Sequence, residues 1–233
     1  GIGGVLSQDL IQAGTEALPD TDGGISYEAW YELLPGGSHT IPVSVHPGDV
    51  VSVSVSQQSS ADNTWLIVFT NKTTGESNRT NVHYVSSLSS ADWIEEMPAG
   101  VNMRIGLDNF GAVTFTNGST VENGVTETIM GSGAQSLTMA NNEDVALAIP
   151  STINADGESF SVTRTNAATD SIGEDTLGFA GGDDGGFSWH HHYATPNDST
   201  DSNGTSTTIS LPGGFSITLS FGSDGKLYVE ASS

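Results

Sequence analysis

Short stretches in which apolar and polar residues alternate recur along the chain, and turn residues separate them. Val, Ile, Phe and Thr are common in these stretches, and few segments have the spacing of a helix. Alternation of this kind is typical of strands with one buried face. The expected strands are Ile25–Leu33, Thr40–Val45, Val50–Val55, Thr64–Thr70, Asn81–Val85, Asn102–Leu107, Ala112–Thr116, Ser136–Met139, Val145–Ile149 and Ser159–Thr163.

The segments between these strands contain turn residues. Pro35-Gly36-Gly37, Pro47-Gly48-Asp49 and Thr74-Gly75 supply the fixed or positive φ angles that tight turns need. Many short strands at this spacing predict an all-β fold, an antiparallel β-sandwich.

The character of the sequence changes near residue 168. Residues 168–186 are rich in Gly and Asp, and Phe215–Phe221 with Lys226–Val229 predicts a terminal hairpin. We therefore expect a β-sandwich over residues 1–167. Residues 168–233 are expected to form a linker and a hairpin tail of unknown role, which could complete the sandwich.

The charge balance is strongly acidic. The chain has 5 Lys and Arg against 28 Asp and Glu, a formal net charge of -23 at pH 7. This charge argues against nucleic acid and against an anionic membrane surface as partners. Near pH 3–4 most of it would be neutralised, which suits an acidic environment. Halophilic adaptation is the alternative, but charged residues make up only 14% of the chain, so we favour acid exposure.

Several features bear on localisation. There is no Cys and no run of 18 apolar residues, so disulfides, thiolate metal sites and a membrane span within these residues are excluded. The first residue is Gly1, which suggests a processed or excised product. Five N-glycosylation sequons would suit a secreted protein, although they also arise by chance in such sequences: Asn71, Asn78, Asn117, Asn197 and Asn203.

Four segments carry a family resemblance. They are Gly1–Gly4 with Leu10–Glu16, Ser26–Glu32 with Pro35, Ala91–Glu96, and Phe110–Asn117. In this order they resemble conserved stretches of the glutamic peptidases, or eqolisins. The resemblance implies a sandwich of two large packed, curved sheets, and an endopeptidase that acts in acid on polypeptides and is secreted.

The resemblance also implies residue roles. It places the catalytic amide on Gln12 and the catalytic carboxylate on Glu96, rather than on Asp92 or Glu95. It places substrate binding on Trp30, Glu32, Tyr27 and Glu16. No cofactor and no metal are implied.

This chain departs from the family pattern in several places. The N-terminal strands of the family have no counterpart before Gly1, so we expect a separate light chain or segment, a fragment, or a tail that fills the gap. Gly3, Glu16 and Leu33-Leu34 replace an Asp, an Asp and a Trp-Tyr of the pattern. These changes bear on substrate preference and on the support of Gln12.

The implied pair has the chemistry that peptide hydrolysis needs. A Glu can take a proton from water as general base and return it to the leaving amine as general acid. A Gln amide does not titrate, so its N–H can donate to the oxyanion at any pH. Trp30 and Tyr31 alternate across their strand, so one can face a cleft while the other enters the core.

Other interpretations remain open at this stage. Taken singly, Gln12 is an ordinary surface amide and Glu96 a solvated loop acid. The same fold could serve as a non-catalytic binding module for glycans or surfaces. His190–His192 could centre a metal-dependent hydrolase, but consecutive strand residues point to opposite faces. A Ca²⁺ site is a further alternative, on Asp183, Asp184, Asp198 and Asp201.

Overall fold

The structure is a computed structural model, and it describes the chain in two units. The described residues are 1–4, 7, 9–20, 24–96, 107–140 and 145–167, with the backbone of four strands in the last 43 residues. The units are Gly1–Ile94 and Glu95–Ser233, and each is described by itself. The expected boundary after residue 167 stays a prediction.

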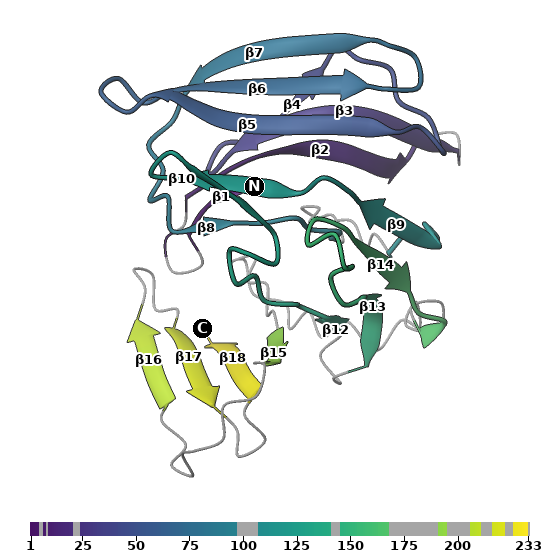
Figure 1. The fold of residues 1–233 in the computed structure, drawn as a ribbon. Coiled ribbons are helices and arrows are strands. Elements are labelled where there is room, and N and C mark those ends of the chain that lie inside the picture. The colour runs from purple at the N-terminus through teal and green to yellow at the C-terminus, as the bar shows by residue number, and fades with distance from the viewer. Residues whose placement is uncertain are drawn as a thin grey trace. The chain divides into compact units, whose positions relative to one another are not determined.

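The first unit contains two antiparallel sheets (Figure 1). The five-stranded sheet has the order β4-β3-β2-β1-β8, with bounds β1 Ile2–Gly3, β2 Leu10–Pro19, β3 Ile25–Leu33, β4 Ser38–Ile41 and β8 Ser90–Ala91. The three-stranded sheet has the order β5-β6-β7, with bounds β5 Val51–Ser59, β6 Thr64–Asn71 and β7 Ser77–His83.

The core of this unit draws side chains from both sheets. In β6 the alternation of the sequence becomes an alternation of burial, and Trp65, Ile67 and Phe69 are all buried. Ile11 of β2 and Ala29 of β3 belong to the same buried cluster. Because one cluster contains the inner faces of both sheets, the unit is a β-sandwich, as predicted.

The second unit is also built of antiparallel strands. One sheet has the order β12-β13-β14-β9, with bounds β9 Ala112–Phe115, β12 Met139–Ala140, β13 Ala146–Pro150 and β14 Phe160–Arg164. Phe115 and Phe160 stand directly opposite each other in it, and their rings stack with centroids 4.9 Å apart.

A hairpin joins β10 (Ser119–Glu122) to β11 (Val125–Thr128). A tail sheet has the order β15-β18-β17-β16, with bounds β15 His191–Ala194, β16 Ser206–Ser210, β17 Ser216–Phe221 and β18 Lys226–Ser232.

All the elements of the described chain are strands, so the predicted fold class is confirmed. The predicted strand Ile25–Leu33 has the observed bounds, and the terminal hairpin pairs β17 with β18. The predicted strand Asn102–Leu107 lies outside the described residues except for Leu107, which is buried. No helix long and apolar enough to cross a membrane occurs in the part of the chain that is described.

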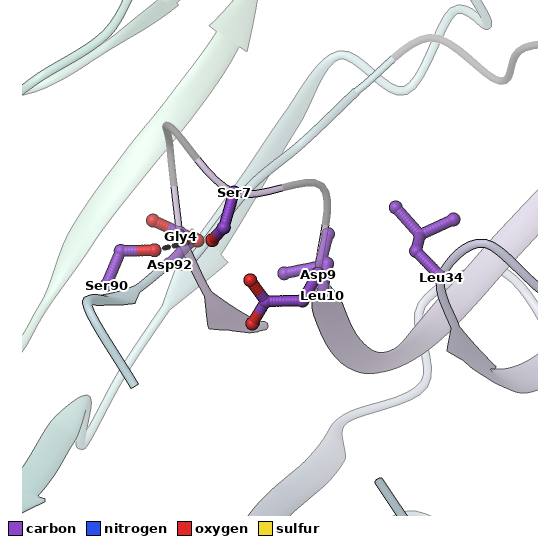
Figure 2. Close-up of a pocket in the computed structure, with 7 residues that line it drawn as sticks. All are labelled: Gly4, Ser7, Asp9, Leu10, Leu34, Ser90 and Asp92. Carbon is purple, nitrogen blue, oxygen red and sulfur yellow. Dashed lines mark hydrogen bonds between the residues drawn. The ribbon is translucent and has the colours of Figure 1, made fainter. Parts of the chain in front are cut away.

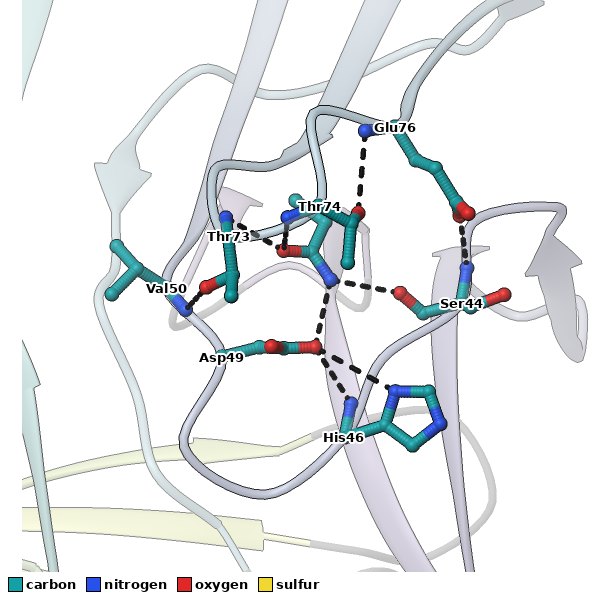
Figure 3. Close-up of polar contacts among 8 residues, drawn as sticks. Ser44, His46, Asp49, Val50, Thr73, Thr74 and Glu76 are labelled. Carbon is teal, nitrogen blue, oxygen red and sulfur yellow. Dashed lines mark hydrogen bonds and ion pairs between the residues drawn. The ribbon is translucent and has the colours of Figure 1, made fainter.

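A buried amide joins two of the predicted turns (Figure 3). Asn71, at the end of β6, is 0% exposed, and its Nδ2 donates to Ser44 O at 2.9 Å and to Asp49 Oδ2 at 2.8 Å. Its Oδ1 accepts from the backbone N–H groups of Thr73 and Thr74. Every hydrogen-bonding position of the amide is therefore used. The sequon at Asn71 is closed to modification in the folded chain.

Candidate functional site

The polar face of the five-stranded sheet carries most of the predicted site residues. Gln12, Gly14 and Glu16 alternate along β2, and they stand directly opposite Glu32, Trp30 and Glu28 of β3. Opposed residues of an antiparallel pair share one face, as do residues two apart on one strand. The six positions therefore lie on one side of the sheet.

Gln12 is held by a hydrogen bond across the two strands. Its Nε2 donates to Glu32 Oε2 at 2.9 Å, and both side chains are half-buried. The partners are opposed on the ladder, so the backbone pairing itself sets the distance between them. Gln12, the predicted catalytic amide, thus forms a hydrogen bond with Glu32, a predicted substrate-binding residue.

Trp30 stands opposite Gly14, between the Gln12–Glu32 pair and the Glu16–Glu28 pair. A Cβ built on Gly14 would stand 3.8 Å from Trp30 Cζ2, in ordinary van der Waals contact, so the indole covers the position opposite it. The Nε1–H of Trp30 is buried, and no acceptor for it is found among the described residues. A buried donor without an acceptor costs about 1–3 kcal/mol, so this N–H is a candidate for binding a ligand oxygen.

Glu16 lies in an acidic environment. Burial, followed by the charges of Glu28 and Glu32, raises the pKa of Glu16 above its usual value. Glu28 accepts a hydrogen bond from Thr40 Oγ1 of β4 at 3.1 Å. Sequence reasoning did not select Glu28, although it is two residues from Trp30 on the same strand, so period-two alternation could have identified it.

Tyr27 lies on the opposite face of the sheet from Gln12. Both Tyr27 and Tyr31 pack against the buried cluster between the sheets, and Tyr31 also stacks on His39 with ring centroids 4.9 Å apart. The structure therefore brings Gln12, Trp30 and Glu32 together and leaves Tyr27 on the core side.

The predicted catalytic carboxylate belongs to the second unit. Glu96 is exposed, while the neighbouring Glu95 is half-buried. Burial, with the charges of Glu96 and Asp108, raises the pKa of Glu95 to about 7. Perturbed carboxyl groups are common at active sites, so Glu95 is a residue that motif matching alone passed over. Gln12 and Glu96 fall in different units, and their pairing stays a prediction.

A hollow of about 230 Å³ lies at the start of β2 (Figure 2). Its lining is formed by Gly4, Ser7, Asp9, Leu10, Leu34, Ser90 and Asp92. None of the predicted site residues lines it. Hydrogen bonds, chiefly from Ser7 and from the backbone of Ser87, lower the pKa of Asp9 to about 2. The hollow is thus bordered by a carboxylate that stays charged in acid.

Tyr84 fixes the first residue of β2 beside this hollow. Its hydroxyl accepts a hydrogen bond from Leu10 N at 2.6 Å and donates one to Leu34 O at 2.9 Å. Leu34 N also donates to Leu10 O at 3.0 Å. One side chain therefore joins the start of the strand that carries Gln12 to the end of the strand that carries Glu32.

The metal alternatives fall largely outside the described residues. His191 and His192 belong to β15 by their backbone, but their side chains are not described. His190 lies outside the described residues, and so do the four candidate Ca²⁺ ligands, Asp183, Asp184, Asp198 and Asp201. Among the side chains that are described, no three His, Asp or Glu residues are grouped so that they could hold a metal ion.

Two known proteins are similar to this chain. Aspergillopepsin-2 of Aspergillus niger is 30% identical over 122 residues, which are 50% of this chain and 42% of that protein. The chain thus matches less than half the length of this relative. The crystal structure of aspergilloglutamic peptidase from Aspergillus niger resembles the chain with a TM-score of 0.58 and 25% identity. That similarity covers 68% of this chain and 91% of the other chain.

A family model decides the assignment. The model of the peptidase A4 family matches residues 1–164, which include the polar face of the five-stranded sheet and both predicted catalytic residues. The chain therefore belongs to the peptidase A4 family, the glutamic peptidases.

Proposed function

We propose that this chain is an acid-acting endopeptidase in which Gln12 and Glu96 activate a water molecule for attack on a peptide bond. The observation that carries the proposal is the family match over residues 1–164, within which Gln12 lies half-buried on the polar face of a sandwich. A shared family supports a shared chemistry where the residues that perform it are present.

The reaction needs no covalent intermediate. Glu96 takes a proton from water while the water oxygen bonds to the carbonyl carbon, and the carbonyl oxygen becomes an oxyanion. The Gln12 Nε2–H donates to this oxyanion, an interaction worth about 3–4 kcal/mol at comparable sites. Glu96 then gives the proton to the amide nitrogen as the C–N bond breaks. The products are a carboxylic acid and an amine.

The substrate is an extended polypeptide lying along the polar face of β2 and β3. The indole of Trp30 gives this face an apolar surface, and its Nε1–H, for which the described residues supply no acceptor, is a donor for a substrate carbonyl. Glu16 adds a carboxyl group next to it. We leave Tyr27 out of the binding surface because it packs against the core.

The charge of the protein supports the proposed action in acid. With a net charge of -23 at pH 7 and pKa values raised at Glu16 and Glu95, the chain accumulates repulsion between carboxylates as the pH rises. An enzyme of this composition works best in acid, where the chain carries less negative charge than at pH 7. We therefore infer a secreted protein in an acidic environment. A separate light chain stays a prediction, which the intact mass of the purified material tests.

Incubation with denatured casein between pH 2 and pH 7 tests the proposal. We expect cleavage in acid, unaffected by a chelator, and a loss of at least a hundredfold in both Gln12→Ala and Glu96→Gln. Absence of cleavage at any pH would favour the non-catalytic binding module instead. Cleavage that a chelator abolishes would favour a metal-dependent hydrolase.

A further inference from the structure

The hydrogen bond between Gln12 and Glu32 selects one of two orientations of the Gln12 amide. The nitrogen and oxygen ends of a Gln side chain have nearly the same shape, so packing alone hardly distinguishes them. Glu32, when ionised, can only accept hydrogen bonds. With Nε2 towards Glu32 Oε2 the pair is complementary at 2.9 Å. With the amide turned over, two acceptors would face each other without a proton between them.

This selection bears directly on the atom that catalysis uses. Nε2 carries two protons, and the bond to Glu32 engages one of them. Within the described part of the chain no acceptor for the other proton is found, and this is the N–H that the proposed mechanism directs at the oxyanion. If the amide turned over, Oε1 would replace this donor, and an acceptor would oppose the developing negative charge.

The position of Glu32 suits it to this task. Gln12 and Glu32 are an opposed pair inside the longest ladder of the first unit, where β2 and β3 pair from Ile11 and Leu33 to Pro19 and Ile25. Both backbones are therefore held by regular pairing. Within the described residues Glu32 forms no ion pair, so its carboxylate is not committed to a neighbouring cation.

We propose that Glu32 is a positioning residue that locks the Gln12 amide with its N–H groups towards the reaction. The inference rests on the proposed function for its catalytic meaning. It differs from the substrate-binding role that sequence resemblance implies for Glu32, because the residue acts here through Gln12.

Three variants test the lock. Glu32→Leu removes the acceptor, and we expect kcat to fall at least tenfold while KM changes less than twofold. Glu32→Gln keeps size and hydrogen bonding but can pair with either amide orientation, so kcat should fall by a smaller factor. In a Gln12→Ala background, Glu32→Leu should cost nothing further, since the group that it positions is gone. Glu122→Gln, at an exposed carboxylate of the β10–β11 hairpin, is the control for loss of one charge.

A spectroscopic measurement separates this inference from the proposed function. The side-chain ¹H–¹⁵N signals of Gln12, identified by their loss in Gln12→Ala, should show one shifted proton in the wild type and lose that shift in Glu32→Leu. If the wild type cleaves nothing, the proposed function fails and these signals alone decide whether the amide is locked.

Several results would overturn the inference. They are an unchanged kcat in Glu32→Leu, or a change in KM alone. A further loss of kcat of the same size in the Gln12→Ala background would also overturn it, as would Gln12 side-chain signals that do not shift in Glu32→Leu. If Glu32→Leu does not fold, Glu32→Gln decides by the same readings.

Discussion

Glu16 and Glu28 stand directly opposite each other on β2 and β3, two carboxyl groups of like charge on one face of the sheet. Like charges in an opposed pair destabilise a sheet by about 0.2–1 kcal/mol. The raised pKa of Glu16 reflects the same repulsion, after burial. Because the folded chain holds this proton more tightly than the unfolded chain, stability falls as the pH rises from 4.5 through the raised pKa.

Glu28→Gln should remove this repulsion. We expect the free energy of unfolding to rise by about 0.2–1 kcal/mol at pH 7 and to stay unchanged at pH 3, where Glu16 is protonated. Urea unfolding followed by Trp fluorescence measures both values. An equal gain at the two pH values would show that charge is not the cause.

Glu95→Gln and Glu96→Gln should separate stability from catalysis. For Glu95 the raised pKa of about 7 means that its carboxyl favours folding below pH 4.5, an advantage that is lost as the pH rises from 4.5 to about 7. We expect Glu95→Gln to stabilise the chain at pH 7 by about 1–2 kcal/mol, allowing for solvent screening, and to keep peptidase activity within a few fold.

Glu96→Gln should have the opposite profile, with activity lost and stability little changed. Thermal unfolding at pH 3 and pH 7 measures the stability of each variant, and casein cleavage measures its activity. If Glu95→Gln is inactive while Glu96→Gln keeps its activity, the catalytic role belongs to Glu95 instead.

Asn71→Ala should destabilise the first unit by about 2–4 kcal/mol, because two backbone N–H groups, a carbonyl and Asp49 lose their hydrogen-bond partner.

Asn71→Asp offers a test that depends on pH. Its ionised carboxylate would face Asp49 and Ser44 O, so the loss at pH 7 should exceed the loss near pH 3. Denaturant titrations at the two pH values measure this difference, and identical losses would contradict it.

Tyr84→Phe should weaken the start of β2. The change leaves Leu10 N and Leu34 O without the hydroxyl that joins them, at a cost of about 1–3 kcal/mol. Hydrogen exchange should accelerate at the Leu10 amide. Tyr31→Phe is the matched control, because among the described residues no hydrogen bond to the Tyr31 hydroxyl is found. Equal effects of the two variants would argue against the bridging role.

Much of the fold follows from local pattern. β6 alternates between half-buried and buried positions, as the sequence from Thr64 to Asn71 indicates, and β3 has its predicted bounds. Pro47-Gly48 and Thr74-Gly75 form turns in which both glycines adopt positive φ, at 88° and 81°. In these segments the local preference and the final structure agree.

Other elements needed more than local pattern. β2 was not among the predicted strands, because Leu10–Pro19 contains Ala, Gly and Glu where a regular apolar alternation would be expected. Its pairing with β3 determines that it is a strand. The β10–β11 hairpin was also absent from the prediction, although Asn123-Gly124, with φ values of 51° and 78°, is a strong hairpin signal.

By itself the sequence determined the all-β class, the acidic character and the family, since alternation, composition and motif order are properties of the chain alone. Tertiary structure decided which residues meet. That Gln12 binds Glu32, that Glu16 opposes Glu28 and that Tyr27 turns towards the core all depend on the register between strands. A shift of one residue would send each side chain to the other face, and only the packing of the whole sandwich selects the register.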